Sequence, residues 1–348
     1  MKSIKNAFLR MTSFEALMKA HHMSRLGRRH YSSVMDFERD LNGNLADLRR
    51  SLLDGSYCVG EYRVFEVFEP KKRTIMAVEY KDRVVMHALC DEVLFPFFER
   101  RLDSGNVACR EGKGTHYGLK KTAEHLRSAY NKAGLDFYIL KCDIAKYFYS
   151  IRHEVLKNNL YRFIKDRDIR WVCDRIIDST KGEVGIPIGN LSSQFFAVFY
   201  LDGFDRFVRE ELGVKLYNRY MDDFVLIHHD KEYLLECLGK IKEYLHVNLG
   251  LTLNSKTQIF PAKHGVDYLG FHTYIGGSGR IFRKLRHRSK AGVKRKIRAF
   301  GNKFKAGRID KKRIEQSMAS WLGHTKFGDC WVLRKKIMRR LNGVLRKG

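Results

Sequence analysis

The sequence predicts an α+β protein that ends in a basic helical region. Hydrophobic residues recur at helical spacing through residues 1–58. Apolar runs typical of strands occupy 137–144 and 214–228. Residues 279–348 interleave lysine and arginine with aromatic anchors, which favours a folded basic module over a solvated charge run. A chain of 348 residues is long enough for two or three subdomains.

Local patterns predict the other elements in order. Alternating residues indicate two strands within 61–80, joined by a basic turn at 70–73. Apolar periodicity predicts helices over 84–98, 116–133, 191–212 and 233–249. The first of these is expected to end near Pro96, because proline breaks the helical hydrogen-bond pattern.

Two adjacent carboxylates, Asp222 and Asp223, are the most informative residues in the chain. They separate the apolar runs 214–220 and 224–228, a pattern typical of a β-hairpin with both carboxylates at its tip. Alone, such a pair is more often a solvated turn. Asp143, however, ends another apolar run that predicts a buried strand. Carboxylates so arranged can bind two Mg²⁺ ions roughly 3.5–4 Å apart, which activate a 3′-hydroxyl and stabilise a leaving pyrophosphate.

The charge of the chain indicates a polyanionic partner. The chain has 67 Lys+Arg against 39 Asp+Glu, a net charge of +28 and a pI near 9.8, which favours nucleic acid over an acidic membrane surface. No apolar run reaches the roughly 18 residues of a membrane span, and no signal-peptide core follows Met1. The seven scattered cysteines form no CxxC pair, so we expect no zinc site, no disulfide framework and a reducing cytoplasm.

Five blocks in a fixed order resemble the motifs of reverse transcriptases. They are Asp143 in the first palm motif, Gly185–Gln194 in the second, Tyr220–Asp223 in the third, Lys256 in the fourth, and Val266–Phe271 as a primer-grip hairpin. The resemblance covers roughly residues 45–345. It implies a right-hand polymerase fold with fingers, a palm whose antiparallel sheet carries the Tyr-Met-Asp-Asp hairpin, and a helical thumb. The implied activity is RNA-directed DNA polymerisation.

The second block indicates a subfamily. Most reverse transcriptases have Gln and Pro where this chain has Ile188 and Gln194, and this variant resembles the enzymes of diversity-generating retroelements. Those enzymes copy a template RNA into cDNA with frequent errors opposite adenine, and the cDNA then replaces a variable repeat in a target gene (mutagenic retrohoming). Other stretches agree with this resemblance: Lys81–Leu89, Cys109–His116 and Ser320–His324. Retron, group II intron-like and phage-defence reverse transcriptases are alternatives, as is a non-catalytic RNA-binding protein that retains the fold.

The resemblance implies roles for the catalytic residues. Asp143, Asp222 and the Ile144 backbone carbonyl are expected to bind two Mg²⁺ ions, with Mn²⁺ as a substitute. Asp223 completes the set of carboxylates at the periphery of the metal site. Lys256 is expected to protonate the leaving pyrophosphate, although an exposed lysine here needs no function.

Other residues are expected to bind substrates. Lys71 and Arg73 hold the triphosphate or contact the template backbone. Phe148 excludes a ribose 2′-hydroxyl, or is an ordinary core aromatic. Ile188 and Gly189 lie against the nascent base pair, or Ile188 packs under the 191–212 helix. The residues expected to contact nucleic acid are all basic: Arg110, Lys113, Arg283, Lys284, Arg286, Lys294 and Arg295.

We expect three regions: an N-terminal helical extension over 1–58, fingers and palm over 59–278, and a basic helical thumb over 279–348 that grips the RNA–cDNA duplex. The expected partners are template RNA, cDNA, deoxynucleoside triphosphates and a small basic helical accessory protein that forms oligomers, with no membrane. The expected location is the cytoplasm of a bacterial, archaeal or phage-infected cell.

Overall fold

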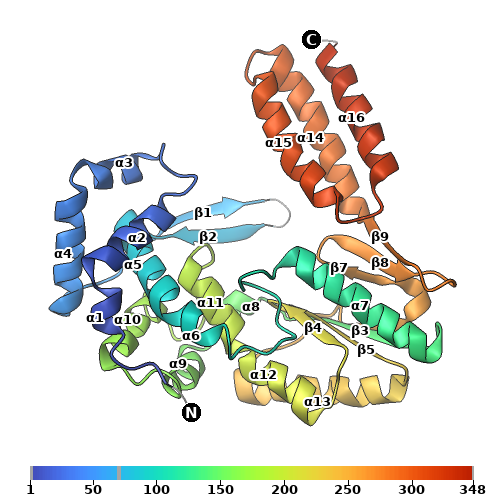
Figure 1. The fold of residues 1–348 in the computed structure, drawn as a ribbon, viewed down its shortest axis with the longest axis horizontal. Coiled ribbons are helices and arrows are strands. Elements are labelled where there is room, and N and C mark those ends of the chain that lie inside the picture. Colours follow the sequence, from blue (N-terminus) through green and yellow to red (C-terminus); the bar gives the residue numbers. More distant parts are fainter. Residues whose placement is uncertain (1–2, 69–71, 347–348) are drawn as a thin grey trace.

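The computed structural model describes residues 3–68 and 72–346 and confirms the α+β class. It begins with four helices: α1 (Phe8–Met11), α2 (Phe14–Ser24), α3 (Ser32–Arg39) and α4 (Leu41–Leu53) (Figure 1). Ser13 and Asp40 cap α2 and α4, because each side chain accepts a hydrogen bond from a backbone N–H of the first turn. Leu17, Leu45 and Leu52 of these helices are buried in the largest core of the protein.

A two-stranded hairpin follows the N-terminal helices. Strands β1 (Arg63–Val67) and β2 (Arg73–Ala77) pair antiparallel, with Arg63 opposite Ala77 and Val67 opposite Arg73. Asp82 fixes the chain that leads into β1, since its buried carboxylate accepts hydrogen bonds from Tyr57 Oη at 2.9 Å and Gly60 N at 3.0 Å. The hairpin is therefore anchored at its base and extends toward solvent.

The helix predicted over 84–98 starts earlier and contains a π-helical turn. It runs as α5 (Tyr80–Leu89), η1 (Cys90–Leu94) and α6 (Phe95–Phe98). Pro96 has no N–H to donate to the Glu92 carbonyl, and its ring would collide with that carbonyl in a regular helix. Arg10 Nη2 instead donates to the Glu92 carbonyl oxygen at 2.8 Å, and this hydrogen bond connects α1 to the π-helical turn η1.

The central sheet is antiparallel and has the strand order β4-β5-β3-β6. Its strands are β3 (Tyr138–Asp143), β4 (Tyr217–Tyr220), β5 (Asp223–His228) and β6 (Gln258–Pro261), and it lies between α7 (Thr115–Ala133) and α13 (Lys231–Leu249) (Figure 1). Ile139 and Val225 pack in one core cluster with α7, whereas Leu140 and Leu226 pack in another with α13. Burial of both faces explains why β3 and β5 are continuous apolar runs.

The segment between β3 and β4 is helical. It contains α8 (Tyr147–Ser150), α9 (His153–Tyr161), α10 (Arg167–Ile177), α11 (Leu191–Tyr200), α12 (Asp202–Arg206) and the π-turn η2 (Phe207–Glu211). The single helix predicted over 191–212 is therefore divided. The first break is at Leu201, whose φ of −99° and ψ of 9° are not helical. Residues 191–201 are mostly buried, and a buried helix carries no polar stripe that would reveal where it ends.

A second sheet and a helical bundle complete the chain. Strands β7 (Val266–Tyr268), β8 (Phe271–Ile275) and β9 (Ile281–Leu285) pair in that order, after the short 3₁₀ turn η3 (Ala262–His264). Helices α14 (His287–Lys305), α15 (Lys311–Thr325) and α16 (Trp331–Arg346) then pack around their own core, which includes Val293, Ile297, Ile314, Met318, Ile337 and Leu341. The basic region expected to be helical from residue 279 thus begins with a strand.

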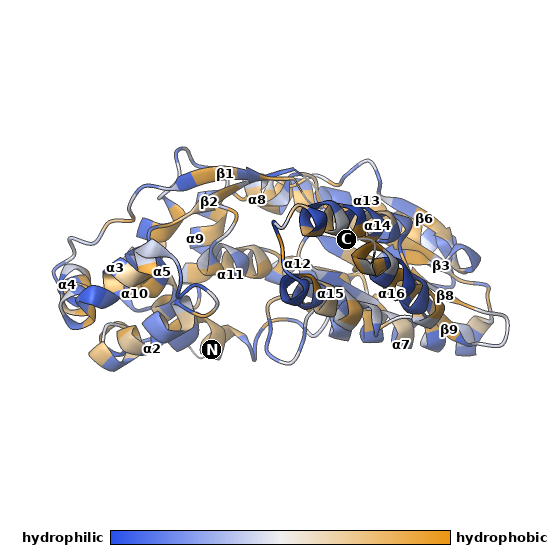
Figure 2. Ribbon diagram, turned by 90° about the horizontal axis from the view of Figure 1, so that it is seen from above, coloured by the Kyte–Doolittle hydropathy of each residue, from blue (hydrophilic) through white to orange (hydrophobic). Residues whose placement is uncertain are grey.

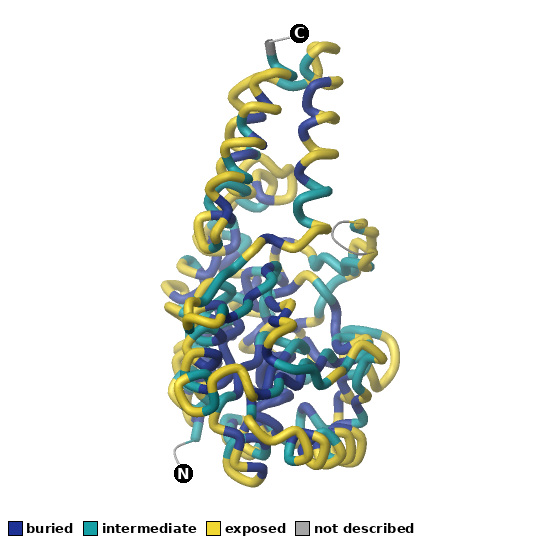
Figure 3. The backbone as a smooth tube through the Cα atoms, turned by 90° about the vertical axis from the view of Figure 1, so that its right-hand side faces the viewer, coloured by how far each residue is buried: buried dark blue, intermediate teal, exposed yellow. Residues whose placement is uncertain are grey.

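The bundle projects away from the body of the molecule (Figures 1 and 3). Figure 3 shows buried residues along the inner side of its helices and exposed residues along the outer side, and Figure 2 shows hydrophilic stretches along α14, α15 and α16. Over the residues that the structure describes, no helix combines the length and the apolar character needed to cross a membrane.

Candidate active site

Three aspartates, Asp143, Asp222 and Asp223, belong to the segments at one end of the central sheet. Asp143 is the last residue of β3 and lies opposite Asp223, the first residue of β5, in the strand register. Met221 and Asp222 form the turn between β4 and β5, and Ile144 N donates to the Asp222 carbonyl at 3.1 Å. The two sequence segments that carry these residues therefore lie side by side. The hairpin differs from expectation in one detail, because Asp223 begins the strand instead of lying at the tip.

The electrostatics of this end of the sheet favour a cation. Burial raises the pKa of Asp222, and the nearby negative charge of Asp143 raises it further, while Lys141 and Arg73 act in the opposite direction. Two carboxylates that repel one another, beside a backbone carbonyl at Ile144, are hard oxygen donors of the kind that Mg²⁺ prefers. Within the described residues no three His, Cys, Asp or Glu side chains form a metal cluster. Asp143 and Asp222 alone would leave a bound cation to take its remaining ligands from phosphate and water.

Asp223 is engaged by a lysine that sequence reasoning missed. Lys141 of β3 forms an ion pair with the Asp223 carboxylate, and only 15% of the Lys141 side chain is exposed. Its ammonium group also lies 5.5 Å from the centre of the Tyr268 ring in β7. Burial lowers the pKa of Lys141 to about 8, although the negative charges of Asp143 and Asp222 act in the opposite direction.

A fully buried ion pair between Arg219 and Asp205 supports the turn between β4 and β5. Arg219 donates from Nε to Asp205 Oδ1 at 2.7 Å, and neither side chain is exposed. The Tyr217 hydroxyl donates to the same carboxylate at 2.6 Å. Arg219 Nη1 also donates to the carbonyl of Met221 at 2.9 Å, and Met221 has a left-handed φ of 57°. The guanidinium therefore holds the strained residue that directly precedes Asp222.

Lys256 belongs to a segment that is attached to the same strand end. Asn254 N donates to the Asp143 carbonyl at 2.7 Å, and Ala145 N donates to the Thr252 carbonyl at 2.9 Å. The backbone N–H of Lys256 in turn donates to Asn254 Oδ1 at 3.1 Å. The side chain of Lys256 is exposed.

Of the residues expected to contact the nucleotide, those that the structure describes lie in β2, in α8 or next to β2. Arg73 begins β2, is exposed and lies close enough to Asp222 to lower the pKa of that carboxyl. Lys71 lies outside the described residues. Phe148 on α8 is half-buried, with its ring edge-on to Tyr147 at 5.8 Å between centres. This packing is compatible with either role expected for Phe148.

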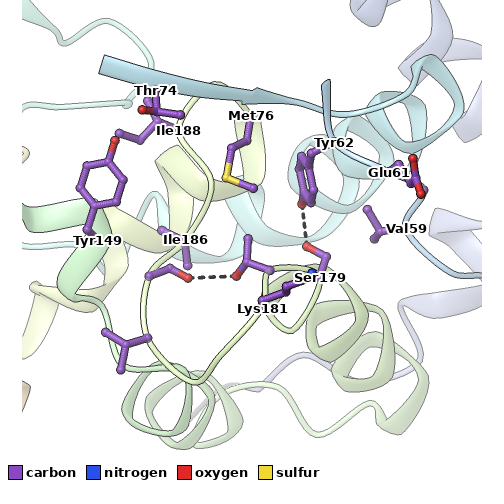
Figure 4. A pocket seen from close by; sticks show the side chains of 14 residues that line it. Val59, Glu61, Tyr62, Thr74, Met76, Tyr149, Ser179, Lys181, Ile186 and Ile188 are labelled. Carbon is purple, nitrogen blue, oxygen red and sulfur yellow. Dashed lines mark hydrogen bonds between the residues drawn. The ribbon is translucent and has the colours of Figure 1, made fainter. Parts of the chain in front are cut away.

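Ile188 and Gly189 lie against strand β2. The Ile188 carbonyl accepts a hydrogen bond from Met76 N at 3.0 Å. Gly189 has φ of +125°, and a Cβ there would lie 2.9 Å from Ile75 Cγ2, so only glycine fits this approach. The Ile188 side chain faces a pocket of about 770 Å³ that Thr74, Met76 and other residues also line (Figure 4).

The far wall of this pocket comes from the α10–α11 connection. The Tyr62 hydroxyl and Ser179 Oγ lie 2.6 Å apart, and Figure 4 shows this direct contact between two side chains that line the pocket. Thr180 Oγ1 donates to the Gly185 carbonyl at 3.2 Å. The first contact joins the segment before β1 to the α10–α11 connection, and the second holds that connection to the segment that contains Ile188. Together they fix the walls of the pocket.

Arg110 is occupied by contacts within the protein. Its guanidinium donates to Glu99 Oε1 at 2.9 Å and to the carbonyls of Glu99 and Asp103 at 2.6 and 2.8 Å, and 7% of its side chain is exposed. These contacts indicate that Arg110 holds the 99–106 loop in place. They argue against the predicted contact between Arg110 and template phosphates. Lys113 is half-buried, and its ammonium lies 5.7 Å from the centre of the Tyr117 ring.

The basic residues expected in the thumb fall into two groups. Arg283, Lys284 and Arg286 lie on or next to β9 and contact the protein: Arg283 Nη1 donates to the Phe327 carbonyl at 3.1 Å, Lys284 lies 5.2 Å from the Tyr274 ring centre, and Arg286 pairs with Asp267 at 3.0 Å. Lys294 and Arg295 are exposed on α14. From residue 279 onward the sequence has only three acidic residues, Asp310, Glu315 and Asp329, so the positive charge of the bundle is largely uncompensated.

The sequence matches the model of a known protein family, and the fold is similar to that of a solved structure. Residues 69–273, more than half of the chain, match the family model described as "Reverse transcriptase (RNA-dependent DNA polymerase)". A search of curated proteins gave no match to the sequence. Among solved structures, telomerase from Candida albicans, in complex with a TWJ fragment of telomeric RNA, is similar in fold. The TM-score is 0.52 at 12% identity, and the match covers 73% of this chain and 54% of the telomerase chain.

The family match and the likeness to this solved structure together show a reverse transcriptase-like fold, as the sequence predicted. The chain spans about half the length of the telomerase chain that it matches. The family match begins after β1, ends within β8 and contains Asp143, Asp222 and Asp223. Reverse transcriptase domains use divalent metal ions, which agrees with the donor set at the end of the central sheet. The chain therefore belongs to the reverse transcriptase family of RNA-directed DNA polymerases.

Proposed function

We propose that this reverse transcriptase serves a diversity-generating retroelement and copies a template RNA into error-rich cDNA for mutagenic retrohoming. The observation that carries this proposal is Ile188 together with Gln194 in the second motif. The Ile188 side chain offers only aliphatic carbon to the pocket beside β2. Dispersion contacts have little directional preference, whereas a glutamine would hold one geometry through hydrogen bonds. A mispaired base is therefore penalised less beside isoleucine. The preference for errors opposite adenine rests on the family resemblance alone.

The proposed reaction is two-metal nucleotidyl transfer. The primer 3′-hydroxyl loses its proton to water, and its oxygen bonds to the α-phosphorus of a deoxynucleoside triphosphate. The bond between this phosphorus and the oxygen that bridges to the β-phosphorus breaks, and pyrophosphate leaves. Asp143, Asp222 and the Ile144 carbonyl would hold two Mg²⁺ ions, or Mn²⁺ in their place, which supply activation of the hydroxyl and neutralise charge on the leaving group. Asp223, held by Lys141, stays at the periphery, and the exposed Lys256 donates a proton to the pyrophosphate.

The substrates are proposed to lie between the hairpin and the central sheet. Arg73, which acts electrostatically on Asp222, binds the triphosphate together with Lys71. Phe148 stands five residues after Asp143 and excludes the 2′-hydroxyl of a ribonucleotide. Ile188 and Gly189 contact the base pair that forms. In this arrangement residues 59–278 are the fingers and palm.

The helical bundle is proposed to be the thumb. Its exposed lysine and arginine side chains, including Lys294 and Arg295, bind the phosphates of the RNA–cDNA duplex. Residues 1–58 form the N-terminal extension. We further propose that the enzyme acts in the cytoplasm with a small basic helical accessory protein that forms oligomers.

Sequencing of cDNA tests this proposal. The purified protein, supplied with Mg²⁺, a primed RNA template and all four deoxynucleoside triphosphates, is expected to make DNA whose substitutions concentrate opposite template adenines. Asp222→Ala is the matched control and is expected to make none. Errors spread evenly over the four template bases would favour a retron or group II intron-like enzyme. Absence of DNA synthesis in Mg²⁺ and in Mn²⁺ would favour a non-catalytic RNA-binding protein.

A further inference from the structure

Gln194 is the second residue that distinguishes the Gly185–Gln194 block of this chain from that of most reverse transcriptases, which have proline there. It lies in the first turn of α11, where its backbone N–H donates to the Asn190 carbonyl at 3.3 Å. Proline has neither this N–H nor a polar side chain, whereas the Gln194 side chain is exposed. Glutamine therefore adds an exposed amide group at the beginning of α11.

A cysteine of the neighbouring loop orients this amide. The Cys109 thiol donates to Gln194 Oε1 at 3.6 Å, and burial raises the pKa of Cys109 to about 11, so the thiol keeps its proton at neutral pH. The loop itself is fixed beside β4, because Val107 N donates to the Arg219 carbonyl at 2.9 Å. A glutamine amide has two N–H donors besides its oxygen. Since the oxygen faces Cys109, both N–H groups are available, and no acceptor for them lies among the residues that the structure describes.

The helical turn that carries Gln194 lies beside the turn between β4 and β5. Val198 follows Gln194 by one helical turn and lies on the same face of α11. The Val198 carbonyl accepts a hydrogen bond from Arg219 Nη2 at 3.2 Å, while Arg219 Nη1 donates to the carbonyl of Met221 at 2.9 Å. The segment directly before α11 contacts β2, and Figure 1 shows α11 between the β1–β2 hairpin and the central sheet. The exposed amide is therefore located between the hairpin and the catalytic turn.

This position suits contact with the edge of a base pair. An RNA–cDNA duplex forms an A-like helix, whose wide and shallow minor groove exposes base edges to side chains. A pair of adenine with thymine or uracil presents only acceptors there, adenine N3 and the pyrimidine O2, and the Gln194 N–H groups are the complementary donors. Ile188 and Gly189 are proposed to contact the pair that forms. Gln194 lies nearer to the β4–β5 turn and is placed to meet the preceding pair, at the primer terminus.

We propose that Gln194 is a further specificity-determining residue, whose side-chain amide donates a hydrogen bond to the minor-groove edge of the base pair at the primer terminus. The inference rests on the proposed function, which supplies the RNA–cDNA duplex. A correct pair holds its acceptor within reach of the oriented amide, whereas a mispair displaces the acceptor, and a hydrogen bond weakens steeply when its angle is distorted. Errors that form beside Ile188 therefore meet a second check at the next addition, and Gln194 determines how readily they are extended.

Nucleotide addition on two primed RNA templates tests this inference. The template nucleotide that pairs with the primer 3′ end is adenosine in one and 3-deazaadenosine, which has C–H in place of N3, in the other. The wild type should add the next correct nucleotide about 3- to 10-fold more slowly on the second template, because one neutral hydrogen bond is lost. Gln194→Met keeps the length of the side chain but has no donor, so its rates on the two templates should be equal. The same comparison with a 3-deazaadenine at the primer 3′ end covers the other strand.

Two further variants separate base contact from a structural effect. Gln316→Met removes an exposed glutamine from α15 and is the matched control, which should slow on 3-deazaadenosine as the wild type does. Cys109→Ala removes the thiol that orients the amide and should lower the sensitivity to 3-deazaadenosine without abolishing DNA synthesis. Gln194→Met should also extend a mispaired primer terminus more readily, so the ratio of mispaired to paired extension should rise several-fold over that of the wild type.

The outcomes separate this inference from the proposed function. Equal sensitivity to the 3-deaza base in wild type and Gln194→Met, or a wild type that is insensitive on both strands, would overturn it. A 2′-deoxy template nucleotide that reproduces the slower addition would assign the contact to the ribose hydroxyl and also overturn it. Only correct additions are counted, so errors spread evenly over the template bases would contradict the retroelement proposal and leave this inference standing.

Binding of the same duplexes decides the case in which the wild type makes no DNA. Weaker binding of the 3-deaza duplex by the wild type, with equal binding of both duplexes by Gln194→Met, would support the contact while the polymerase proposal fails. Equal affinities of the wild type for both duplexes would overturn the contact as well.

Discussion

At the residue scale, the active site depends on two ion pairs that keep its geometry. Arg219 and Asp205 are fully buried, so removal of either partner leaves an uncompensated charge, which typically costs about 3–5 kcal/mol. Lys141 and Asp223 form the second pair, directly beside Asp143. The first pair supports the turn that presents Asp222, and the second neutralises the charge of Asp223 beside Asp143.

Lys141→Met tests the role of the second ion pair. The substitution keeps the length of the side chain but leaves Asp223 free to compete for the metal, so kcat for nucleotide addition should fall about 10- to 100-fold. The Mg²⁺ dependence of the rate should change with it. Lys141→Met/Asp223→Asn restores the charge balance and should recover part of the activity in a double-mutant cycle. Two fully additive effects would mean that the pair is not coupled to the chemistry.

Ile188→Gln tests the fidelity mechanism at a single side chain. Glutamine adds a donor and an acceptor to an otherwise aliphatic wall, so errors opposite template adenine should become less frequent by several-fold. Both proteins copy the same RNA template, and the cDNA products are sequenced. Met76→Gln, in the same pocket, is the control for added polarity alone. Equal error rates at adenine for wild type and Ile188→Gln would remove Ile188 from the mechanism.

At the element scale, the sequence predicts best what depends on local pattern. The helix over 116–133, the strand that ends at Asp143 and the hairpin at Asp222 all appear in the structure, because apolar periodicity and turn residues are local signals. Lys141 and Asp205 were missed, since their roles depend on which strand or helix packs beside them. Arg110 has the charge of a phosphate ligand, but the carbonyls that it binds come from a loop whose path no local pattern reveals.

Helix α7 contains a buried histidine that links its packing to pH. His125 has 6% of its surface exposed, and burial lowers its pKa to about 4. In the unfolded chain the His125 imidazole is protonated as the pH falls below about 6.5, whereas in the folded protein it stays neutral down to about pH 4. The free energy of unfolding should therefore fall as the pH decreases from 6.5 to about 4. The destabilisation attributable to His125 is at most about 3 kcal/mol.

Chemical denaturation of His125→Gln across this pH range checks the prediction. The variant should show a shallower dependence of unfolding free energy on pH than the wild type, because glutamine does not titrate. His264→Gln removes an exposed histidine and should leave the pH dependence unchanged. Identical pH profiles for wild type and His125→Gln would show that the buried imidazole is protonated without cost.

At the scale of the whole molecule, positive charge is concentrated at one end. The net charge of +28 predicted a nucleic-acid partner, but only the structure shows that the basic bundle folds around its own core and projects from the body. Lys294→Gln/Arg295→Gln should lower the salt slope of RNA–DNA duplex binding by about 0.7–0.9 for each phosphate that is no longer neutralised. Lys120→Gln/Lys240→Gln removes two exposed lysines that pair within their own helices, and this control should leave the salt slope unchanged. Equal slopes for all three proteins would contradict a role for α14 in duplex binding.

The central claim is that Asp143 and Asp222 supply the metal-binding oxygens for DNA synthesis, and primer extension by Asp222→Asn tests it most directly. Asparagine preserves the size of the side chain and removes the charge that would hold a cation. The purified variant should bind primed RNA template as the wild type does, because affinity comes from the basic surface. It should extend the primer no further than a reaction without enzyme, in Mg²⁺ or in Mn²⁺. Extension at a rate near that of the wild type would contradict the account.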